Sequence, residues 1–342
     1  MLTAVVKNKV IAVNNIDLPT IGDEEILVKM HSCGICGSDL EKVFGEYGMK
    51  SSRIGHEPAG EVAKVGRNVK TIEPGERIFA HHHVSCHSCR LCLEGDYTMC
   101  DMYQNSNIEP CGLSEFFIVP EQNISNGGVL KLPTNVSYDE AALIEPLACC
   151  LRGLSKIAIR HGYIVAIFGA GPTGLMHAML AERQGAAKII LIDFNEFRLN
   201  FAKRFSDLSI LNPSAECDIV NEIHKLTDNI GVDATILATG NMNTLVQALK
   251  ITRKGGRILL FGVPSSKTGF DLNLGQLYSN EHLIIPSYGA SELETNQALY
   301  FIYDKSINVT NLITHRFNLR ETNSAFQCAH TAHDSMKVII VS

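Results

Sequence analysis

Residues 163–174 read YIVAIFGAGPTG, an apolar run that ends in a glycine-rich turn. The apolar half predicts a strand, and residues 174–181, which follow the turn, predict a helix. Between a strand and a helix, glycines with the spacing Gly-x-Gly-x-x-Gly allow a tight turn and let a pyrophosphate approach the helix N-terminus. The residues that we expect to bind a dinucleotide at this turn are Gly169, Gly171, Pro172, Thr173 and Gly174.

A second apolar strand, residues 188–193, ends on an acidic residue, Asp193, nineteen positions after Gly174. A carboxylate at this place hydrogen-bonds the ribose hydroxyls of NAD and would repel the 2′-phosphate of NADP. The sequence therefore favours NAD as the cofactor. Arg198, five residues further on, is a reservation because it could partly receive that phosphate, although an arginine on a helix surface is the commoner case.

Segments that read alternately as helix and strand continue from this motif to about residue 289. Apolar strands that alternate with helices predict a doubly wound parallel sheet, so we assign residues 151–289 to an NAD-binding Rossmann domain of an α/β protein. A chain of 342 residues is long enough for a second domain. Short strands separated by Gly and Pro over residues 1–80 predict a small irregular β-barrel there.

A candidate metal site lies within this first segment, where residues 31–39 read HSCGICGSD and residues 55–57 read GHE. The Cys36 thiolate and the His56 imidazole are twenty residues apart and can converge on one zinc ion. Two or three protein ligands leave a position open for substrate, which marks a catalytic zinc. The hydroxyl of Ser38 could then contact the substrate oxygen. A buried cysteine and a core histidine are the simpler interpretation for either residue alone.

Four cysteines gathered in fifteen residues form a second candidate metal site. They are Cys86, Cys89, Cys92 and Cys100. Four thiolates with these spacings predict a closed tetrahedral zinc site, which would hold together a lobe that has few apolar residues. An iron–sulfur cluster or free thiols are the alternatives. The histidines just upstream, at residues 81–83, are more consistent with lining a site than with metal ligation.

One carboxylate stands inside an apolar segment, residues 137–159, that reads as a helix. Glu145 would be costly to bury there without a partner. A metal ion or a hydrogen-bond network must receive it, and the first zinc site is short of one ligand. We therefore predict that Glu145 is a ligand of the catalytic zinc.

Composition and charge exclude several classes of protein. The chain is 45% hydrophobic and 19% charged, and its net charge of −6 is not gathered into blocks. This pattern argues against a nucleic-acid or membrane-surface partner and leaves a small-molecule substrate. The N-terminal residues turn polar at once, unlike a secretory signal, so we expect a cytoplasmic protein. Eleven cysteines in such a protein indicate metal binding rather than disulfides.

Together these motifs resemble the medium-chain zinc-dependent alcohol dehydrogenase family over essentially the whole chain. The Gly-His-Glu at residues 55–57 and the Glu-Pro-Leu-Ala at residues 145–148 resemble its sorbitol (polyol) and threonine dehydrogenase branch. The resemblance implies a chaperonin-10-like β-barrel as the catalytic domain, made of residues 1–150 and 290–342. It also implies two zinc ions per chain, one catalytic and one in a structural lobe at about residues 86–100.

The resemblance further implies roles for the site residues. The ligands of the catalytic zinc would be Cys36, His56 and either Glu57 or Glu145, and relatives differ in which glutamate binds directly. Asp39 would be the carboxylate that orients His56. Many relatives carry a relay histidine five residues after the ligand cysteine, where this sequence has Glu41. Either Glu41 carries the proton in its place, or Glu41 is a solvated helix residue and the relay runs through water.

The expected reaction is the reversible oxidation of a secondary alcohol, most plainly a polyol, by NAD. Zinc would lower the pKa of the substrate hydroxyl, Ser38 would accept its proton, and hydride would pass to the nicotinamide. Oxidation of threonine or of an aldose is not distinguished by the sequence. A nucleotide-binding sensor or scaffold with only a structural zinc is the non-enzymatic alternative. An apolar strand at residues 282–285 could pair with its copy, and the resemblance suggests a homodimer or homotetramer.

Overall fold

The computed structural model describes residues 1–45, 53–205, 208–213, 218–241, 243–264 and 272–342. These residues form two compact units. The discontinuous unit contains the described residues up to Ala148 together with residues 289–342, and the continuous unit contains those from Cys149 to Tyr288. The boundaries predicted from the sequence are residues 150 and 290.

The continuous unit is built on a parallel sheet in the order β10-β9-β8-β11-β12-β13. The strands are β8 (Ile164–Phe168), β9 (Lys188–Ile192), β10 (Ser209–Leu211), β11 (Val232–Leu237), β12 (Thr252–Leu260) and β13 (Leu283–Pro286). The helices of the same segment are α7 (Pro172–Arg183), α8 (Glu196–Ala202), α9 (Ile219–Leu226), α10 (Asn243–Ile251) and α11 (Leu274–Asn280). Numbered along the chain, the strand order is 3-2-1-4-5-6, which is that of a doubly wound dinucleotide-binding fold. The predicted Rossmann fold is therefore confirmed.

The strands of this sheet are apolar because both faces of the sheet are covered. Residues 165–167 of β8 and residues 190–191 of β9 are completely buried, and α9 and α10 add Ile223 and Ile251 to the same core. Such strands read as continuous apolar runs, which is why the sequence predicts them. The connections from β8 and from β11 lead away in opposite directions, so a crevice forms at the carboxyl ends of these two strands.

The discontinuous unit is built on a mainly antiparallel sheet in the order β14-β15-β3-β4-β5-β7, with β6 also paired to β3. Its strands are β3 (Ile26–Gly34), β4 (Glu57–Val65), β5 (Arg77–Ala80), β6 (Phe116–Val119), β7 (Val129–Lys131), β14 (Ile313–Asn318) and β15 (Lys337–Val341), and a separate hairpin joins β1 (Leu2–Lys7) to β2 (Val10–Asn15). Its helices are α1 (Gly37–Val43), α2 (Arg90–Leu93), α3 (Asp101–Asn105), α4 (Glu121–Ser125), α5 (Tyr138–Ala141), α12 (Glu292–Tyr303) and α13 (Thr322–Thr331).

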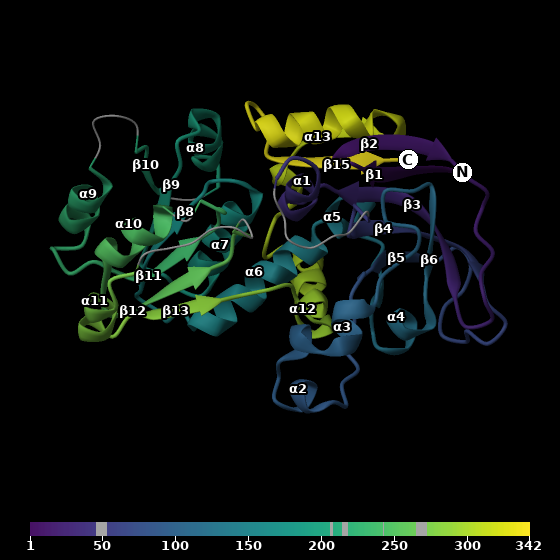
Figure 1. Ribbon diagram of the computed structural model, residues 1–342, viewed down its shortest axis with the longest axis horizontal. Helices are drawn as coiled ribbons and strands as arrows, with labels where there is room; N and C mark the ends of the chain where they lie inside the picture. The colour runs from purple at the N-terminus through teal and green to yellow at the C-terminus, as the bar shows by residue number, and fades with distance from the viewer. Residues whose placement is uncertain (46–52, 206–207, 214–217, 242, 265–271) are drawn as a thin grey trace. The chain divides into compact units, whose positions relative to one another are not determined.

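The end of the chain completes this second sheet. β15 pairs with β3, where Ile339 lies opposite Gly34, and β14 pairs in parallel with β15 across the connecting helix α13. Figure 1 shows β15 and α13 (yellow) beside the N-terminal strands (purple). Neither β14 nor α13 is among the elements predicted from the sequence. Both carry a weak pattern, because no residue of β14 is fully buried and α13 buries only Thr322, Ala325 and Phe326.

The prediction of one helix over residues 137–159 is wrong, because the structure has two. Ala142 and Leu143 separate α5 from α6 (Ile144–Ile157). Before α5, Ser137 and Glu140 form a capping box in which each side chain accepts a hydrogen bond from the backbone of the other. The break places Glu145 in the first turn of α6 instead of in the middle of a long helix.

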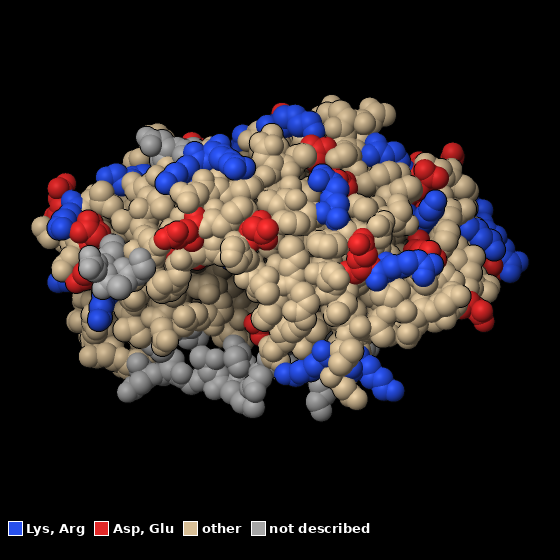
Figure 2. All heavy atoms as spheres, turned by 90° about the horizontal axis from the view of Figure 1, so that it is seen from above, with Lys and Arg blue, Asp and Glu red and all other residues tan. Residues whose placement is uncertain are grey.

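The surface carries charges of both signs. On the face shown in Figure 2, basic and acidic side chains are interspersed. The long uncharged run of residues 163–181 is β8, the glycine-rich turn and most of α7. Across the described ranges, no helix has both the length and the apolar character that a membrane crossing requires.

Candidate catalytic metal site and dinucleotide pocket

The candidate catalytic metal site forms where β3 ends and β4 begins. Cys36 is the residue just before α1, and Glu57 is the first residue of β4, where it lies opposite Gly34 of β3. One ligand atom each from Cys36, His56 and Glu57 lie within 4.8 Å of one another. A Cβ atom on Gly34 would stand 1.7 Å from Glu57 Oε2, so only glycine leaves room for this carboxylate.

Asp39 fixes the orientation of His56. Its Oδ2 lies 3.3 Å from His56 Nδ1 and accepts a hydrogen bond from the Gly55 backbone at 3.3 Å. The other imidazole nitrogen, Nε2, lies 3.9 Å from Glu145 Oε2. Burial alone would raise the pKa of Asp39, but the charges of His56 and Lys42 outweigh it and hold that pKa below its ordinary value. An ionised carboxylate on Nδ1–H leaves Nε2 as the ligand nitrogen.

Glu57 is paired through one oxygen and unpaired through the other. Lys337 on β15 donates from Nζ to Glu57 Oε2 at 2.5 Å and to the Ile35 carbonyl at 3.1 Å. Glu57 Oε1 is buried and has no hydrogen-bond partner among the described residues. Burial raises the pKa of Glu57, and the Lys337 charge opposes this shift. The sequence analysis does not find Lys337, and its only signal is one lysine at the start of an apolar strand.

These residues fit a zinc ion. A thiolate, an imidazole and two carboxylates are donors that zinc accepts in tetrahedral sites. The unpaired buried oxygen of Glu57 requires a partner, and a metal ion among Cys36, His56 and Glu145 would supply one. The structure therefore brings together the four residues predicted as ligands of the catalytic zinc.

The two predicted proton carriers both lie on α1. Ser38 is half buried in the first turn, two residues after Cys36. Glu41 turns toward the end of the helix, where a Cβ atom on Gly45 would meet its carboxylate at 1.8 Å. Ser38 is thus close to the metal ligands along the chain, whereas Glu41 is packed against the last turn of α1.

The histidines that follow β5 line the same site. The ring of His82 is centred 5.0 Å from that of His56, and His81 is completely buried whereas His82 is half-buried. Burial lowers the pKa of His81 to about 3 and that of His83 to about 4. His83 bonds the Ser106 carbonyl through Nδ1 at 2.6 Å. Burial therefore favours the neutral form of all three imidazoles, and the ring of His82 is the one beside His56.

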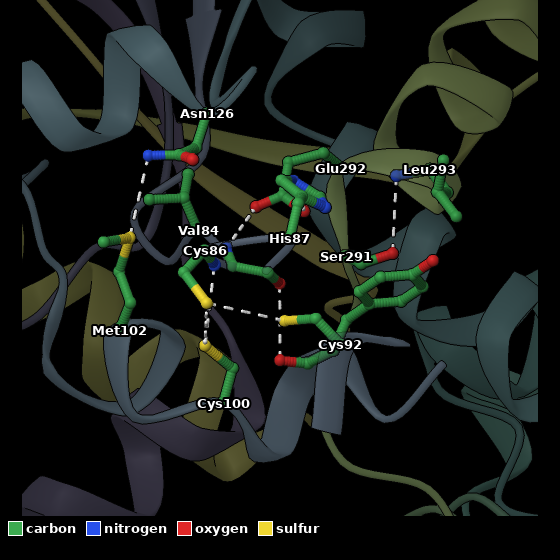
Figure 3. Close-up of polar contacts among 12 residues, drawn as sticks. Val84, Cys86, His87, Cys92, Cys100, Met102, Asn126, Ser291, Glu292 and Leu293 are labelled. Atoms are coloured by element: carbon green, nitrogen blue, oxygen red, sulfur yellow. Dashed lines mark hydrogen bonds and ion pairs between the residues drawn. The ribbon is translucent and has the colours of Figure 1, made fainter. Parts of the chain in front are cut away.

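The four clustered cysteines converge at one point, as a closed metal site requires. Their sulfur atoms are separated by 3.5 Å (Cys86–Cys100), 3.6 Å (Cys89–Cys92) and 3.9 Å (Cys86–Cys92), and Figure 3 shows three of them facing one another. Hydrogen bonds from Ser88 lower the pKa of Cys86 to about 5, whereas burial and neighbouring thiols raise the pKa of Cys92 to about 12. Four sulfurs at these separations fit zinc.

A buried glutamate on α12 anchors this lobe, and the sequence analysis does not identify it. Glu292 accepts a hydrogen bond from the Ser85 backbone at 2.8 Å, and its other oxygen lies 3.6 Å from His87 Nε2. Figure 3 shows Glu292 pointing from α12 toward Cys86 and its neighbours. Glu292 thereby connects the cysteine lobe to the segment that follows the continuous unit.

Two of the predicted dinucleotide residues, Gly169 and Asp193, lie at the carboxyl ends of β8 and β9. A cavity there is lined by Gly169, Ile192, Asp193, Thr239, Asn241 and Thr244, among others. Gly169 has a φ of 103°, and a Cβ atom on it would stand 2.8 Å from the Ala238 carbonyl oxygen. Asp193 accepts hydrogen bonds from the backbones of Ala170 at 2.7 Å and Asn195 at 2.9 Å. The carboxylate is therefore fixed beside the glycine-rich turn.

Arg198 lies against the same turn instead of pointing into solvent from α8. A Cβ atom on Gly171 would stand 3.3 Å from Arg198 Nη1. Arg198 Nε is buried without a hydrogen-bond partner among the described residues. Burial lowers the pKa of Arg198, and Asp193 opposes this shift. A guanidinium held in this way beside a dinucleotide turn is well placed for an anionic ligand.

Known proteins match this chain over nearly its whole length. Residues 22–133 match the alcohol dehydrogenase GroES-like domain, and residues 172–304 match the zinc-binding dehydrogenase domain. The chain is 32% identical to a sorbitol dehydrogenase of Bacillus subtilis (strain 168) over 99% of this chain and 97% of that relative. It is 29% identical to an L-threonine 3-dehydrogenase of Vibrio vulnificus (strain CMCP6), over 95% and 94% of the two chains. Among solved structures, the alcohol dehydrogenase TADH from Thermus sp. ATN1 covers 100% of this chain and 99% of its own, with a TM-score of 0.86 and 27% identity.

The comparisons agree with the geometry of both units. They confirm the predicted fold class and the predicted enzyme class, a zinc-dependent dehydrogenase that oxidises alcohols. Zinc and a nicotinamide dinucleotide are its cofactors, as predicted. The chain belongs to the zinc-binding alcohol dehydrogenase family.

Proposed function

We propose that the protein oxidises a polyol, or another secondary alcohol with a neighbouring hydroxyl, and reduces NAD. The observation that carries this proposal is the lining of the metal site. The ring of His82 lies beside that of His56, and burial favours the neutral form of His82 and of its neighbours His81 and His83. A pocket with such groups can hydrogen-bond several hydroxyls of one substrate, whereas a simple aliphatic alcohol would leave them unpaired.

In this proposal the residues around the metal have separate tasks. Cys36, His56 and one or both of Glu57 and Glu145 hold the zinc ion. When bound, this ion supplies a Lewis acid that lowers the pKa of the substrate hydroxyl. Ser38, in the first turn of α1, accepts the hydroxyl proton, and water carries it outward past Glu41.

Asp39 and Lys337 act through the ligands in this proposal. Asp39 keeps His56 in the tautomer that presents Nε2 to the metal, since it accepts from Nδ1–H. Lys337 opposes the rise in the pKa of Glu57 that burial causes, and so favours its ionised form. Both are therefore positioning residues, and neither needs to touch the substrate.

NAD is the proposed hydride acceptor. The Asp193 carboxylate lines the dinucleotide cavity and would accept hydrogen bonds from the ribose hydroxyls. Arg198, beside Gly171, would contact the cofactor phosphates. The glycine-rich turn would let the pyrophosphate approach the N-terminus of α7.

The second candidate activity is oxidation of an amino alcohol such as threonine, and it is supported by the threonine dehydrogenase among the relatives. Oxidation of an aldose is a third candidate activity. We also propose a homodimer or homotetramer, since β13 is the edge strand of its sheet and exposes Leu283, while α11 exposes Leu274 and Tyr278. A cytoplasmic location is proposed because thiolate ligands persist under reducing conditions.

The deciding experiment is reduction of NAD by the purified protein on a panel of polyols, secondary alcohols, threonine and aldoses, with and without a zinc chelator. We expect chelator-sensitive turnover that is highest on polyols. Cys36→Ala should abolish turnover and reduce the bound zinc by one ion per chain, while NADH still binds. Turnover by Cys36→Ala would overturn the metal assignment, and a preference for threonine would replace the polyol proposal.

A further inference from the structure

A third group of metal-binding side chains lies near the C-terminus of the chain and shares no residue with the two zinc sites. It consists of His315 on β14, Cys328 on α13 and Asp334 in the connection from α13 to β15. One ligand atom each from the imidazole, the thiol and the carboxylate lie within 4.8 Å of one another. Three different donor types therefore meet at one point.

The orientation of His315 leaves one nitrogen available. Its Nδ1 lies 3.0 Å from the Thr314 hydroxyl. That hydroxyl accepts a hydrogen bond from the Met336 backbone at 2.9 Å and donates to the Lys337 carbonyl at 3.5 Å. Because a hydroxyl has one proton and two lone pairs, all three contacts are satisfied when His315 donates from Nδ1–H. In that tautomer the lone pair is on Nε2, as in histidines that bind metals.

The backbone also holds the three side chains together. The pairing of β14 with β15 shifts in register between Ile313 and His315, and such an irregularity changes the direction of a neighbouring side chain. At the other end, Ala332 ends α13 in a left-handed conformation with a φ of 51°. The buried hydroxyl of Ser335 then donates to the Cys328 carbonyl at 2.9 Å. The loop that carries Asp334 is thus fixed to the last turn of α13.

We propose that His315, Cys328 and Asp334 bind a third divalent metal ion, and that this ion is zinc. Nitrogen, sulfur and oxygen donors together suit zinc, whereas magnesium and calcium require oxygen ligands. Zinc–ligand bonds of about 2.0–2.3 Å place tetrahedral ligand atoms about 3.3–3.8 Å apart. The side chain of Asp334 is exposed and can move to bring its carboxylate closer to the ligand atoms of His315 and Cys328. Water would complete the tetrahedron.

The consequence would be a metal link between β14, α13 and the start of β15. This site goes beyond the proposed function, because none of its residues belongs to the catalytic metal site or the dinucleotide pocket. Zinc that binds only the folded chain would raise its thermal midpoint in proportion to the logarithm of the zinc concentration.

The test is a titration with zinc of the full chain in which the catalytic site and the four-cysteine site are already filled. Competition with a chromophoric chelator counts the additional sites, and the same titration with Co²⁺ reports a thiolate ligand through its charge-transfer absorption. We expect one further ion per chain in the wild type and in the control His333→Ala, which changes the exposed neighbour of Asp334. Asp334→Asn should weaken binding of this further zinc ion at least about tenfold. Cys328→Ser should remove the cobalt–thiolate band.

Alcohol oxidation by Asp334→Asn should remain at the wild-type rate, so the result does not depend on the catalytic proposal. Asp334→Asn changes an exposed side chain and keeps the test valid even if Cys328→Ser does not fold. Saturation of the wild type at two zinc ions would overturn the proposal. A third ion bound equally by wild type, Asp334→Asn and Cys328→Ser would overturn it as well.

Discussion

Glu57 and Lys337 form a buried ion pair whose members are 280 residues apart in the sequence. Their side chains are 0% and 4% exposed. A buried pair contributes little net stability against an apolar replacement of both members, but the loss of one member leaves an unpaired buried charge. Lys337 also donates to the carbonyl of Ile35, the residue before the proposed ligand Cys36. The ion pair therefore affects both the stability of the fold and the geometry of the proposed metal site.

We expect Lys337→Met to lower the free energy of unfolding by about 3–5 kcal/mol, because the Glu57 carboxylate loses the charge that compensates it. Urea unfolding monitored by far-UV circular dichroism measures the change. The matched control is Lys64→Met, in which an exposed lysine of β4 is replaced, and it should change stability by less than about 0.5 kcal/mol. The double variant Glu57→Gln, Lys337→Met should recover part of the loss. Equal stabilities of the two single lysine variants would contradict the role given to the ion pair.

Asp193 should decide which nicotinamide cofactor is used. We expect Asp193→Ser to shift the ratio of kcat/KM for NADP to that for NAD upward by at least about tenfold, or roughly 1.4 kcal/mol, since repulsion of the 2′-phosphate is lost while Arg198 stays beside the turn. Steady-state kinetics with both cofactors give the ratio. Glu196→Gln, which removes an exposed charge from α8, is the control. An unchanged ratio in Asp193→Ser would show that the selectivity comes from elsewhere.

At this scale the sequence predicts the ligands but not the residues that support them. Cys36, His56 and the four clustered cysteines follow from spacing, because the ligands of each motif are close along the chain. Lys337 and Glu292 could not be found in this way. Their partners lie in distant segments, and no periodic pattern connects residues that meet only in the folded sheet.

At the scale of single elements, the capping box of α5 shows how a short helix is held. Glu140 accepts hydrogen bonds from the Ser137 backbone at 2.8 Å and from Lys305 Nζ at 2.7 Å. Burial would raise the pKa of Glu140, but its bonds to Lys305 and Ser137 hold that pKa below the ordinary value. The lysine contact is partly exposed, so solvent screens it and most of the stabilisation comes from the cap.

The stability given by Glu140 should depend on pH. Since the pKa is lower in the folded state, the contribution is fully present above the unfolded value of about 4.3 and is lost as the pH falls through the folded value. We expect Glu140→Gln to cost about 1 kcal/mol at pH 7 and progressively less below about pH 4. Thermal unfolding of both proteins across that range measures the difference, with the exposed Glu121→Gln as control. A difference that grows on acidification would contradict the sign of the shift.

The elements that the sequence predicts well are those with a strong apolar pattern. β8 and β9 are buried on both faces, so their composition identifies them. β14 and α13 face solvent over much of their length, and their pairing with β15 depends on contacts that no local pattern encodes. The break between α5 and α6 is missed because the residues that form it are as apolar as their neighbours.

For the whole molecule, the two kinds of cofactor site are divided between the two units. The residues proposed as zinc ligands lie in the discontinuous unit, and the residues that line the proposed dinucleotide cavity lie in the continuous unit. Each unit has its own hydrophobic core. Loss of metal should therefore disturb one unit and leave the other folded.

We expect the metal-free protein to bind NADH with an affinity within about threefold of that of the zinc-loaded protein, because the parallel sheet and its pocket need no metal. The fluorescence of the nicotinamide measures binding directly, and the absence of tryptophan from the chain simplifies the signal. Protein supplied again with zinc is the control. A loss of affinity of about thirtyfold or more would show that the dinucleotide pocket depends on the metal sites.

The position of β15 inside its sheet has a consequence for synthesis on the ribosome. β3 and β4 are made early, but the strand that covers β3 is made last, after the whole continuous unit. At about 5–20 residues per second, residues 149–342 take about 10–40 s to translate. During that interval the Rossmann sheet can fold on the nascent chain, while residues 32–34 of β3, which pair with β15, wait with an open edge. The first sheet to be started is thus the last to be finished.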